Sequence, residues 1–486
     1  MASAVNFRRL AAAIIAIAGT AVMIWFGNGL NPWWPLMWFF PLPVLLFSLR
    51  ASWWSAALTA FTALLLGSLN MWPYLRALAV PFAGWLSIFS SAAFVFALAV
   101  LLFQALLRRC APWTALLAFP AVWVVAEYVR NLVTPHGTAG SLAYTQLHFL
   151  PFLQLASITG PWGMSFLLLL FPAALAVGLH LRHTAPKRAM QIAAAVVGLV
   201  VLVLAFGAIR LALPAPSNQI KVGLVASDLP GNEDIADSGE KTELLFQKYA
   251  AQVEKLATEG AQVIVLPEKV GVVVDSGATT SDAIFQPLAD KTKSTIVVGM
   301  VYANLPALYN RARVYSPGVP PRNYDKHHML PPFESKLMPG TTSVLWPESS
   351  GMEGVEICKD MDFTQLSRQY GKAGAGVLFV PAWDFRIDRA WHGHIAIMRG
   401  VEDGFAIARA AKDGCLTVSD NRGRIVAETR SDSAPFATLI ADVPTTHATT
   451  LYLLLGDWFA WVAIVTLVFA CFQLYWKRGR MAAQSP

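Results

Sequence analysis

The stretch Gly354-Val355-Glu356-Ile357-Cys358-Lys359-Asp360 decides how this chain is interpreted. An apolar, strand-like run ends there on a cysteine, and a charged pair follows at once. A thiol placed where a strand stops can reach into a cleft, whereas a thiol within a strand usually packs into the core. We therefore predict that Cys358 is a nucleophile, and we look outward from it for the groups that would activate it.

The composition of the whole chain indicates a membrane protein. Of its 486 residues, 56% are hydrophobic and only 14% are charged, whereas a soluble protein carries about 25% charged residues. The net charge of +7 raises the question of nucleic-acid binding, but the basic residues stand in short clusters between apolar runs. That pattern is typical of membrane topology, so we expect no nucleic-acid partner. A chain of this length is also expected to form two or more units.

Long apolar runs predict a membrane domain over residues 1–213, with seven transmembrane helices, and an eighth helix near the other end of the chain. Each run is about long enough to cross a hydrocarbon core of roughly 30 Å. The expected spans are 10–28, 33–49, 53–72, 80–107, 112–130, 161–181, 190–212 and 451–476. The run 33–49 is short enough to be re-entrant instead. Segment 131–160 is not a clean span, and we expect an outer-face loop or a partly embedded element there.

The lysines and arginines of the short loops predict the orientation in the membrane. If the N-terminus is cytoplasmic, the short outer loops carry only Arg76 and Arg130. The inner segments then carry all of Arg8, Arg9, Arg50, Arg108, Arg109, Arg182, Lys187, Arg188, Lys477, Arg478 and Arg480. Because basic residues are retained on the cytoplasmic side, both termini are expected to be cytoplasmic. The large segment between the last two spans is then extracytoplasmic.

Residues 214–446 form this large segment, and they have the composition of a soluble domain, rich in charge, glycine and proline. Strand-like runs are expected at 220–227, 262–266, 295–302, 355–357, 377–380, 405–410 and 416–418, and helices at 241–258 and 281–293. Alternation of this kind is typical of a layered α/β domain. Residues 447–486 are expected to hold the last transmembrane helix and a short cytoplasmic tail.

Three segments of the α/β domain each deliver a reactive side chain at the end of a strand-like run or turn. Glu268 follows the run Val263–Pro267, Lys326 follows Tyr324-Asp325, and Cys358 ends the run described above. A thiol with a pKa near 8.5 is mostly protonated at neutral pH, so it needs a base or a nearby cation. Glu268 is suited to take the thiol proton. Lys326 is suited to favour the thiolate and to hold the negative oxygen of a tetrahedral intermediate.

Each of these residues has a plainer interpretation when it is considered alone. A glutamate after a proline is commonly a capping residue, a lysine is commonly solvated, and a cysteine at a strand end is structural in roughly half of cases. His327 and His328 would suggest zinc, but no second pair of ligands stands at the right spacing, so we expect no metal and no cofactor. We expect Cys415 to be a core thiol, and Cys110 and Cys471 to be ordinary membrane-helix residues without a disulfide framework.

Taken together and in this order, Glu268, Lys326 and Cys358 resemble the triad of the carbon–nitrogen hydrolase (nitrilase) superfamily. The resemblance covers most of residues 220–445, including Val380-Pro381-Ala382-Trp383 and Arg399-Gly400-Val401-Glu402-Asp403-Gly404. It implies an αββα sandwich. Eight spans enclosing an extracytoplasmic domain of this kind look like the apolipoprotein N-acyltransferases. The runs 153–156 and 160–166 are also similar to the segment before that family's sixth span.

The resemblance implies an acyltransferase of the bacterial inner membrane, with its catalytic domain on the periplasmic side. Cys358 would take a fatty acyl group from a phospholipid as a thioester. It would then pass that group to the N-terminal amine of a diacylglyceryl-cysteine lipoprotein, so the implied partners are membrane phospholipid and lipoprotein. Glu334 stands eight residues after Lys326 and matches a second functional glutamate of the family. Its implied role is to position the substrate or to stabilise the intermediate.

The chain departs from the family's usual pattern beside the nucleophile. The family commonly has Cys-Tyr-Glu where this chain has Cys358-Lys359-Asp360, and Trp-Pro-Glu where it has Leu266-Pro267-Glu268. Lys359 is either a supporting cation, which would lower the thiol pKa or contact a lipid phosphate, or a solvated lysine at the rim of the cleft.

Two other functions are open to a chain of this organisation. One is a membrane-tethered amidase of the nitrilase type that hydrolyses a small amide, although seven upstream spans exceed what a tether requires. The other is an inactive membrane scaffold or transporter. Ionisable residues inside the membrane would support transport. Glu127 and Asp457 stand near span ends, where an interface location is the simpler interpretation.

Overall fold

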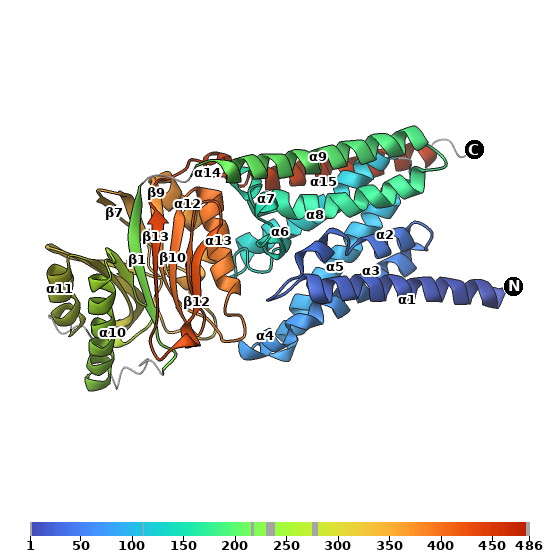
Figure 1. The fold of residues 1–486 in the computed structure, drawn as a ribbon. Coiled ribbons are helices and arrows are strands. Elements are labelled where there is room, and N and C mark those ends of the chain that lie inside the picture. The colour runs from blue at the N-terminus through green and yellow to red at the C-terminus, as the bar shows by residue number, and fades with distance from the viewer. Residues whose placement is uncertain (1, 110, 215–217, 230–238, 275–279, 483–486) are drawn as a thin grey trace. The chain divides into compact units, whose positions relative to one another are not determined.

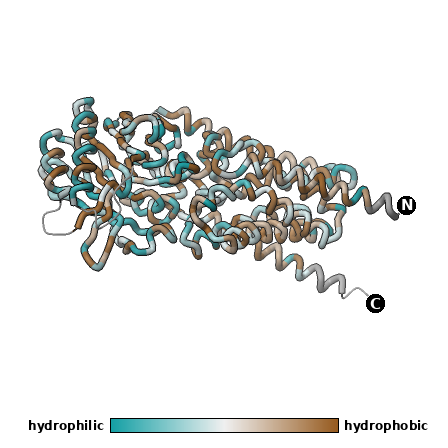
Figure 2. The backbone as a smooth tube through the Cα atoms, turned by 90° about the horizontal axis from the view of Figure 1, so that it is seen from below, coloured by the Kyte–Doolittle hydropathy of each residue, from teal (hydrophilic) through white to brown (hydrophobic). Residues whose placement is uncertain are grey.

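The structure is a computed structural model that describes residues 2–109, 111–214, 218–229, 239–274 and 280–482. It divides into two compact units (Figure 1). The membrane unit comprises Met1–Leu132, Gly140–Leu211 and Leu455–Pro486, and the sandwich unit comprises Val133–Ala139 and Ala212–Leu454. Figure 2 shows that most residues of the long helices are hydrophobic, whereas the sandwich unit has both hydrophobic and hydrophilic residues.

In the described part of the chain, seven helices of the membrane unit are long and apolar enough to cross a membrane. They are α1 (Ala2–Gly27), α3 (Trp53–Ser68, continued by η2, Leu69–Met71, and α4, Trp72–Ala77), α5 (Phe82–Arg108), α6 (Pro112–Val133), α8 (Ala156–Leu181), α9 (Pro186–Ala212) and α15 (Trp458–Ala482). The prediction of a polytopic helical domain is confirmed. The last span is shorter than predicted, because α14 (Leu451–Leu455) ends before α15 begins.

The predicted span 33–49 is not one long helix. It consists of a 3-10 helix, η1 (Trp34–Trp38), and a short helix, α2 (Leu42–Ser48), because its prolines remove helical hydrogen-bond donors. Even so, this stretch carries the chain from one end of the membrane unit back to the other end. At one end, Asn70 after α3 donates to the carbonyl of Asn28 after α1; at the other, Gln104 and Arg108 of α5 donate to the carbonyls of Ser48 and Ala51. Helices α1 and α3 therefore run parallel.

Two acidic residues of the membrane unit are largely buried within it. Glu127 accepts hydrogen bonds from the Trp123 indole, the Ser141 hydroxyl and the Leu142 backbone N–H. Asp457 accepts one from the Trp162 indole at 2.8 Å. Both carboxylates hold other segments of the unit in place, which gives them a structural role. Between α6 and α8, η3 (Leu142–Gln146) and α7 (Leu150–Leu153) complete the unit.

The sandwich unit contains two β-sheets, and the predicted αββα fold is confirmed. In the described residues one sheet has the order β13-β1-β2-β4-β5-β6, with β3 also pairing β4, and the other has the order β12-β11-β10-β9-β8-β7. The strands of the first are β1 (Gln219–Ala226), β2 (Val263–Val265), β3 (Val272–Val274), β4 (Thr295–Asn304), β5 (Ala307–Ser316), β6 (Val319–Asp325) and β13 (Ala437–Pro444). Those of the second are β7 (Val344–Glu348), β8 (Gly351–Val355), β9 (Ala375–Trp383), β10 (Ala406–Lys412), β11 (Cys415–Ser419) and β12 (Ile425–Arg430).

Helices cover the outer faces of both sheets (Figure 1). Helices α10 (Glu240–Thr258) and α11 (Thr280–Thr292) pack on the first sheet through a core that includes Phe246 and Phe285. Helices α12 (Thr364–Lys372) and α13 (Trp391–Asp403) lie against the second sheet. A second core joins the two inner faces, where Leu224 and Val265 meet Phe379 and Ala408.

The central strands of each sheet are parallel, which gathers the reactive segments at their carboxyl ends. Strands β1, β2 and β4 are parallel in one sheet, and β8, β9 and β10 in the other. Ligand sites commonly lie at the carboxyl ends of such strands. The strand predicted at 355–357 is misplaced, because β8 spans Gly351–Val355 and Cys358 begins a short 3-10 helix, η5 (Cys358–Asp362).

Candidate active site

Glu268 lies just beyond β2 and is buried, with 1% of its surface exposed. Its backbone N–H donates to the carbonyl of Ala382 at the end of β9, which ties the two sheets together beside the site. Gly299 of β4 packs directly against the backbone of Pro267 and Glu268, where a Cβ atom would collide. The carboxylate therefore has a fixed position, as a general base requires.

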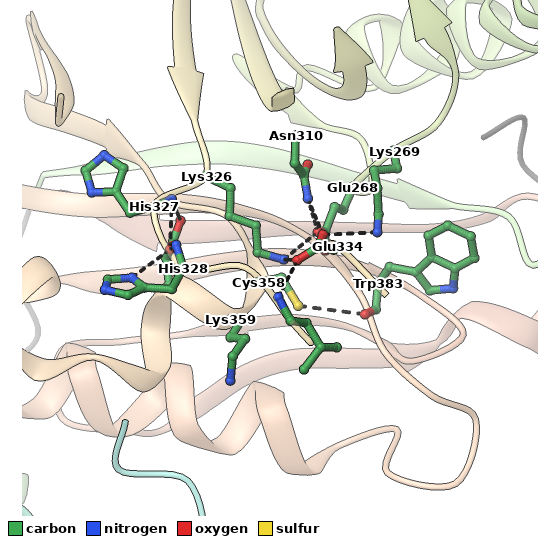
Figure 3. Close-up of polar contacts among 12 residues, drawn as sticks. Glu268, Lys269, Asn310, Lys326, His327, His328, Glu334, Cys358, Lys359 and Trp383 are labelled. Carbon is green, nitrogen blue, oxygen red and sulfur yellow. Dashed lines mark hydrogen bonds and ion pairs between the residues drawn. The ribbon is translucent and has the colours of Figure 1, made fainter. Parts of the chain in front are cut away.

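Lys326 follows β6 and is buried at 2% exposure. Its ammonium group donates to Glu268 Oε1 at 2.8 Å and to Glu334 Oε2 at 2.9 Å. Burial alone would lower the pKa of Lys326, but the charges of Glu268 and Glu334 raise it well above the usual value. The lysine is therefore a permanent cation between two carboxylates (Figure 3).

Cys358 has a left-handed backbone conformation, with φ of 43°, which is uncommon for a residue other than glycine. Its thiol donates to the carbonyl oxygen of Trp383 at 3.7 Å. Burial raises the pKa of the Cys358 thiol well above its ordinary value, and the charge of Glu268 adds to this effect while Lys326 opposes it. The charge of Lys326 acts toward the thiolate, but burial and Glu268 outweigh it, so the resting thiol is protonated.

Glu334 lies in the loop after Lys326 and completes the cluster in which the four predicted residues meet (Figure 3). Its carboxylate accepts four hydrogen bonds: Oε1 from Lys269 at 3.1 Å and Asn310 at 2.7 Å, and Oε2 from Lys326 and from the backbone N–H of Leu330 at 2.8 Å. Burial alone would raise the pKa of Glu334, but Lys326 and Lys269 hold it well below its usual range.

Two residues of this cluster were missed from the sequence. Asn310 of β5 donates from Nδ2 to Glu268 Oε1 and to Glu334 Oε1, so it joins the two carboxylates. Lys269, directly after Glu268, pairs with Glu334. The sequence shows a lysine beside the predicted base, but it does not show in which direction that side chain points. The single amide within an otherwise ordinary strand gave no signal.

Asp360 connects the segment after Cys358 to the segment that carries Lys326. Its buried carboxylate accepts hydrogen bonds from the backbone N–H groups of His327 and His328, from the hydroxyl of Tyr324 and from the ring of His328. These contacts fix the chain on both sides of Lys326. In the described residues no group of three metal-ligating side chains occurs.

Comparison with known proteins agrees with this organisation over both parts of the chain. Residues 11–174 match the family model of the apolipoprotein N-acyltransferase N-terminal domain, and residues 238–450 match the carbon–nitrogen hydrolase model. The two models stand on one chain in the order that the sequence predicted. The chain belongs to the apolipoprotein N-acyltransferase family.

Relatives and solved structures are similar along much of this family member. An apolipoprotein N-acyltransferase of Geobacter metallireducens is 28% identical over 72% of this chain and 72% of its own length. That of Gloeobacter violaceus is 24% identical over 93% of this chain and 92% of its own. Among solved structures, Saccharomyces cerevisiae Nit3 of the nitrilase superfamily is 22% identical, with a TM-score of 0.41, over 50% of this chain and 96% of its own.

Lys359 is where this N-acyltransferase family member departs from the usual pattern, and its side chain points away from the Glu268–Lys326 cluster (Figure 3). It is 5% exposed, and its ammonium group lies 3.3 Å from Asp362 Oδ2 and near the ring of Phe363. It is therefore not a solvated lysine at a rim. Burial alone would raise the pKa of Asp362, but Lys359 and His392 lower it to about 2.

Proposed function

We propose that this acyltransferase moves a fatty acyl group from a phospholipid to the N-terminal amine of a diacylglyceryl-cysteine lipoprotein, through a thioester on Cys358. The observation that carries the proposal is one buried cluster in which a thiol, a carboxylate and a shared ammonium group converge, on a chain whose described residues also include seven long apolar helices. Both proposed substrates are lipids, so the reaction requires a membrane unit. Hydrolysis of a soluble amide would not require one.

In the first half-reaction, the Cys358 sulfur attacks the ester carbonyl carbon of the phospholipid. Because the resting thiol is protonated, its proton passes to Glu268 as the carbon–sulfur bond forms. Among the described residues, Glu268 Oε1 receives Lys326 and Asn310 while Oε2 receives no hydrogen bond, so Oε2 is the basic oxygen. The negative oxygen of the tetrahedral intermediate is held by Lys326 and the backbone N–H of Lys359. The ester C–O bond then breaks, and the lysophospholipid leaves with the proton from Glu268.

In the second half-reaction, the free α-amine of the lipoprotein attacks the thioester carbon. Glu268 accepts a proton from the attacking nitrogen and returns it to the departing Cys358 sulfur, so an amide forms and the thiol is regenerated. Glu334 takes no part in proton transfer under this proposal, because its carboxylate already accepts four hydrogen bonds. Its role is to hold Lys326 in place.

The proposed location is the bacterial inner membrane, with the sandwich unit on the periplasmic side and both termini in the cytoplasm. Contacts within the membrane unit support this orientation. Arg108 donates to the carbonyl of Ala51, and Arg109 to that of Leu474, so three of the basic segments lie at one end of the unit. Trp458 donates to Ile158 and Arg210 to Gln154, so α9 ends and α15 begins at the opposite end.

The test is acyl transfer from labelled phospholipid to a synthetic diacylated lipopeptide by the full chain in detergent micelles. We expect a hydroxylamine-labile acyl adduct on Cys358 when the lipopeptide is withheld, and its transfer when the lipopeptide is added. Cys358→Ala should abolish both, whereas Cys471→Ala, an exposed cysteine of the last helix, should retain both. An absence of adduct in the wild-type protein, with release of ammonia from small amides, would instead establish the amidase.

A further inference from the structure

Lys269 has contacts that single it out from the other lysines of the sandwich unit. It follows Glu268 directly and has a left-handed backbone conformation, with φ of 51°, so the chain turns sharply at the base. Its ammonium group lies 3.1 Å from Glu334 Oε1 and 5.3 Å from the ring centre of Trp383. The carbonyl of Trp383 is the acceptor of the Cys358 thiol. One side chain therefore touches both the Glu334 carboxylate and the residue that orients the nucleophile.

The charges of the cluster balance only when Lys269 is included. Glu268 and Glu334 contribute two negative charges, and Lys326 alone contributes one positive charge. Without Lys269, two buried carboxylates would share a single ammonium group, which is unfavourable in a medium of low dielectric constant. The ion pair of Lys269 with Glu334 brings the resting cluster to neutrality.

The same balance holds during the reaction. When the thiol proton moves to Glu268, that carboxyl group becomes neutral and a new negative charge appears on the substrate oxygen. Glu334 and this oxygen are then opposed by Lys326 and Lys269, and the cluster remains neutral. Without Lys269 the cluster would carry a net negative charge in both states. Lys326 would then be held by Glu334 at the moment when the oxyanion needs it.

We propose that Lys269 is a positioning residue of the acyl-transfer reaction, which neutralises Glu334 so that Lys326 can serve the oxyanion. This inference rests on the proposed function, since it concerns the same site. It assigns the lysine no contact with the substrate. The charge balance depends on Lys269, the residue directly after Glu268. Glu268 and Lys326 alone would not provide it.

The test compares Lys269→Met and Lys269→Arg in the full chain, with Lys291→Met as the control, because Lys291 forms an exposed pair with Glu254. We expect Lys269→Met to lower kcat about 10- to 100-fold with little change in KM. The acid limb of the pH profile should also move upward by about one unit, since both carboxylates lose a neighbouring cation. The charged groups that act on Glu334 are Lys326 and Lys269, those that act on Lys326 are Glu268, Glu334 and the Cys358 thiol, and Lys412 lies over the Trp383 ring. Lys269→Arg should stay within about threefold of the wild type.

An unchanged pH profile in Lys269→Met would overturn the proposal, and so would a loss of activity that arginine does not restore, since a packing role would give both. Cys358→Ala is assayed in parallel. If Cys358→Ala abolishes acylation while Lys269→Met is silent, only the inference about Lys269 fails. If the wild-type chain forms no acyl-enzyme, the proposed function itself fails.

Discussion

At the scale of single residues, the protonation state of Cys358 separates this site from a simple thiolate nucleophile. Burial and Glu268 raise the pKa of the thiol, and Lys326 only partly opposes them. We predict that iodoacetamide alkylates Cys358 at about pH 7 at least tenfold more slowly than a free cysteine, with the rate rising at alkaline pH. Glu268→Gln should speed alkylation, because it removes the repelling charge, while it abolishes acyl transfer. Mass spectrometry of the Cys358 peptide measures the alkylation rate in the wild type and in Glu268→Gln.

The outcome that contradicts this prediction is fast alkylation near neutral pH in the wild-type protein. That result would mean that Lys326 outweighs burial and that the thiol is ionised at rest. Cys415 provides an internal reference in the same experiment, because burial also raises the pKa of its thiol and it lies outside the cluster. A parallel change at Cys415 in Glu268→Gln would indicate a general opening of the domain.

The residues that the sequence could predict are those whose chemistry appears in the local chain. Glu268, Lys326 and Cys358 were proposed from residue type and order and Glu334 from the family resemblance, and the structure brings the four together. Asn310 could not be found in this way, because its contact with both carboxylates depends on the place of β5 beside β4. The direction of Lys359 was also beyond the sequence, since its partner Asp362 is set by the 3-10 helix after Cys358.

At the scale of elements, the segment Val133–Ala139 contacts the 3-10 helix that begins at Cys358. The backbone N–H and hydroxyl of Thr138 both donate to the carbonyl of Asp362, at 2.9 and 2.8 Å. Gly137 has φ of 51°, and a Cβ atom there would collide with that same carbonyl oxygen. We predict that Gly137→Ala displaces the 358–362 helix and lowers acyl-enzyme formation about tenfold, with a destabilisation of about 1–3 kcal/mol.

The matched control for Gly137→Ala is Gly178→Ala in α8, where a Cβ atom would meet nothing within 4 Å. That change should leave activity intact, since alanine is the better helix former. Rates of acyl adduct formation on Cys358 compare the two variants. Equal rates would show that the Thr138 contacts do not set the position of the nucleophile.

The hairpin of β7 and β8 predicts a pH dependence of stability. Glu353 is 1% exposed and accepts a hydrogen bond from the Trp346 indole at 3.0 Å. Burial, with a smaller effect of Glu348, raises the pKa of Glu353 from 4.5 to about 7. The folded chain thus binds more protons than the unfolded chain between these values, so this stability is present below the unfolded pKa and is lost as pH rises through about 7.

We therefore expect the wild-type melting temperature to fall from about pH 5 to pH 8 more steeply than that of Glu353→Gln. The difference in unfolding free energy should be at most about 3 kcal/mol. Gln keeps the shape and the acceptor oxygen for Trp346 but does not ionise. Thermal unfolding of the two proteins across this pH range measures the difference. If their melting temperatures changed in parallel with pH, Glu353 would make no such contribution.

Element prediction succeeded where the pattern was local and failed where pairing decided the outcome. The helices at 241–258 and 281–293 appear as α10 and α11, because their apolar spacing is helical in itself. The strands β3, β5, β6, β7, β12 and β13 were not predicted. Their residues alternate weakly, and β12 in particular is largely exposed, so the hydrogen bonds of neighbouring strands define them. The second span shows the same limit, since apolar length alone did not reveal its break into η1 and α2.

At the scale of the whole molecule, the lysine and arginine bias of the loops makes a prediction about sidedness. Single cysteines at Val319, the exposed first residue of β6, and at Lys187, exposed in the first turn of α9, should behave oppositely in a chain whose own cysteines are replaced. With the outer membrane permeabilised, an impermeant maleimide should label position 319 at once and position 187 only after the inner membrane is opened. Basic loops remain cytoplasmic, and the broken second span still returns the chain across the unit. Reversed labelling would place the thiol cluster in the cytoplasm, away from a lipoprotein substrate on the periplasmic side, and would overturn the proposed function.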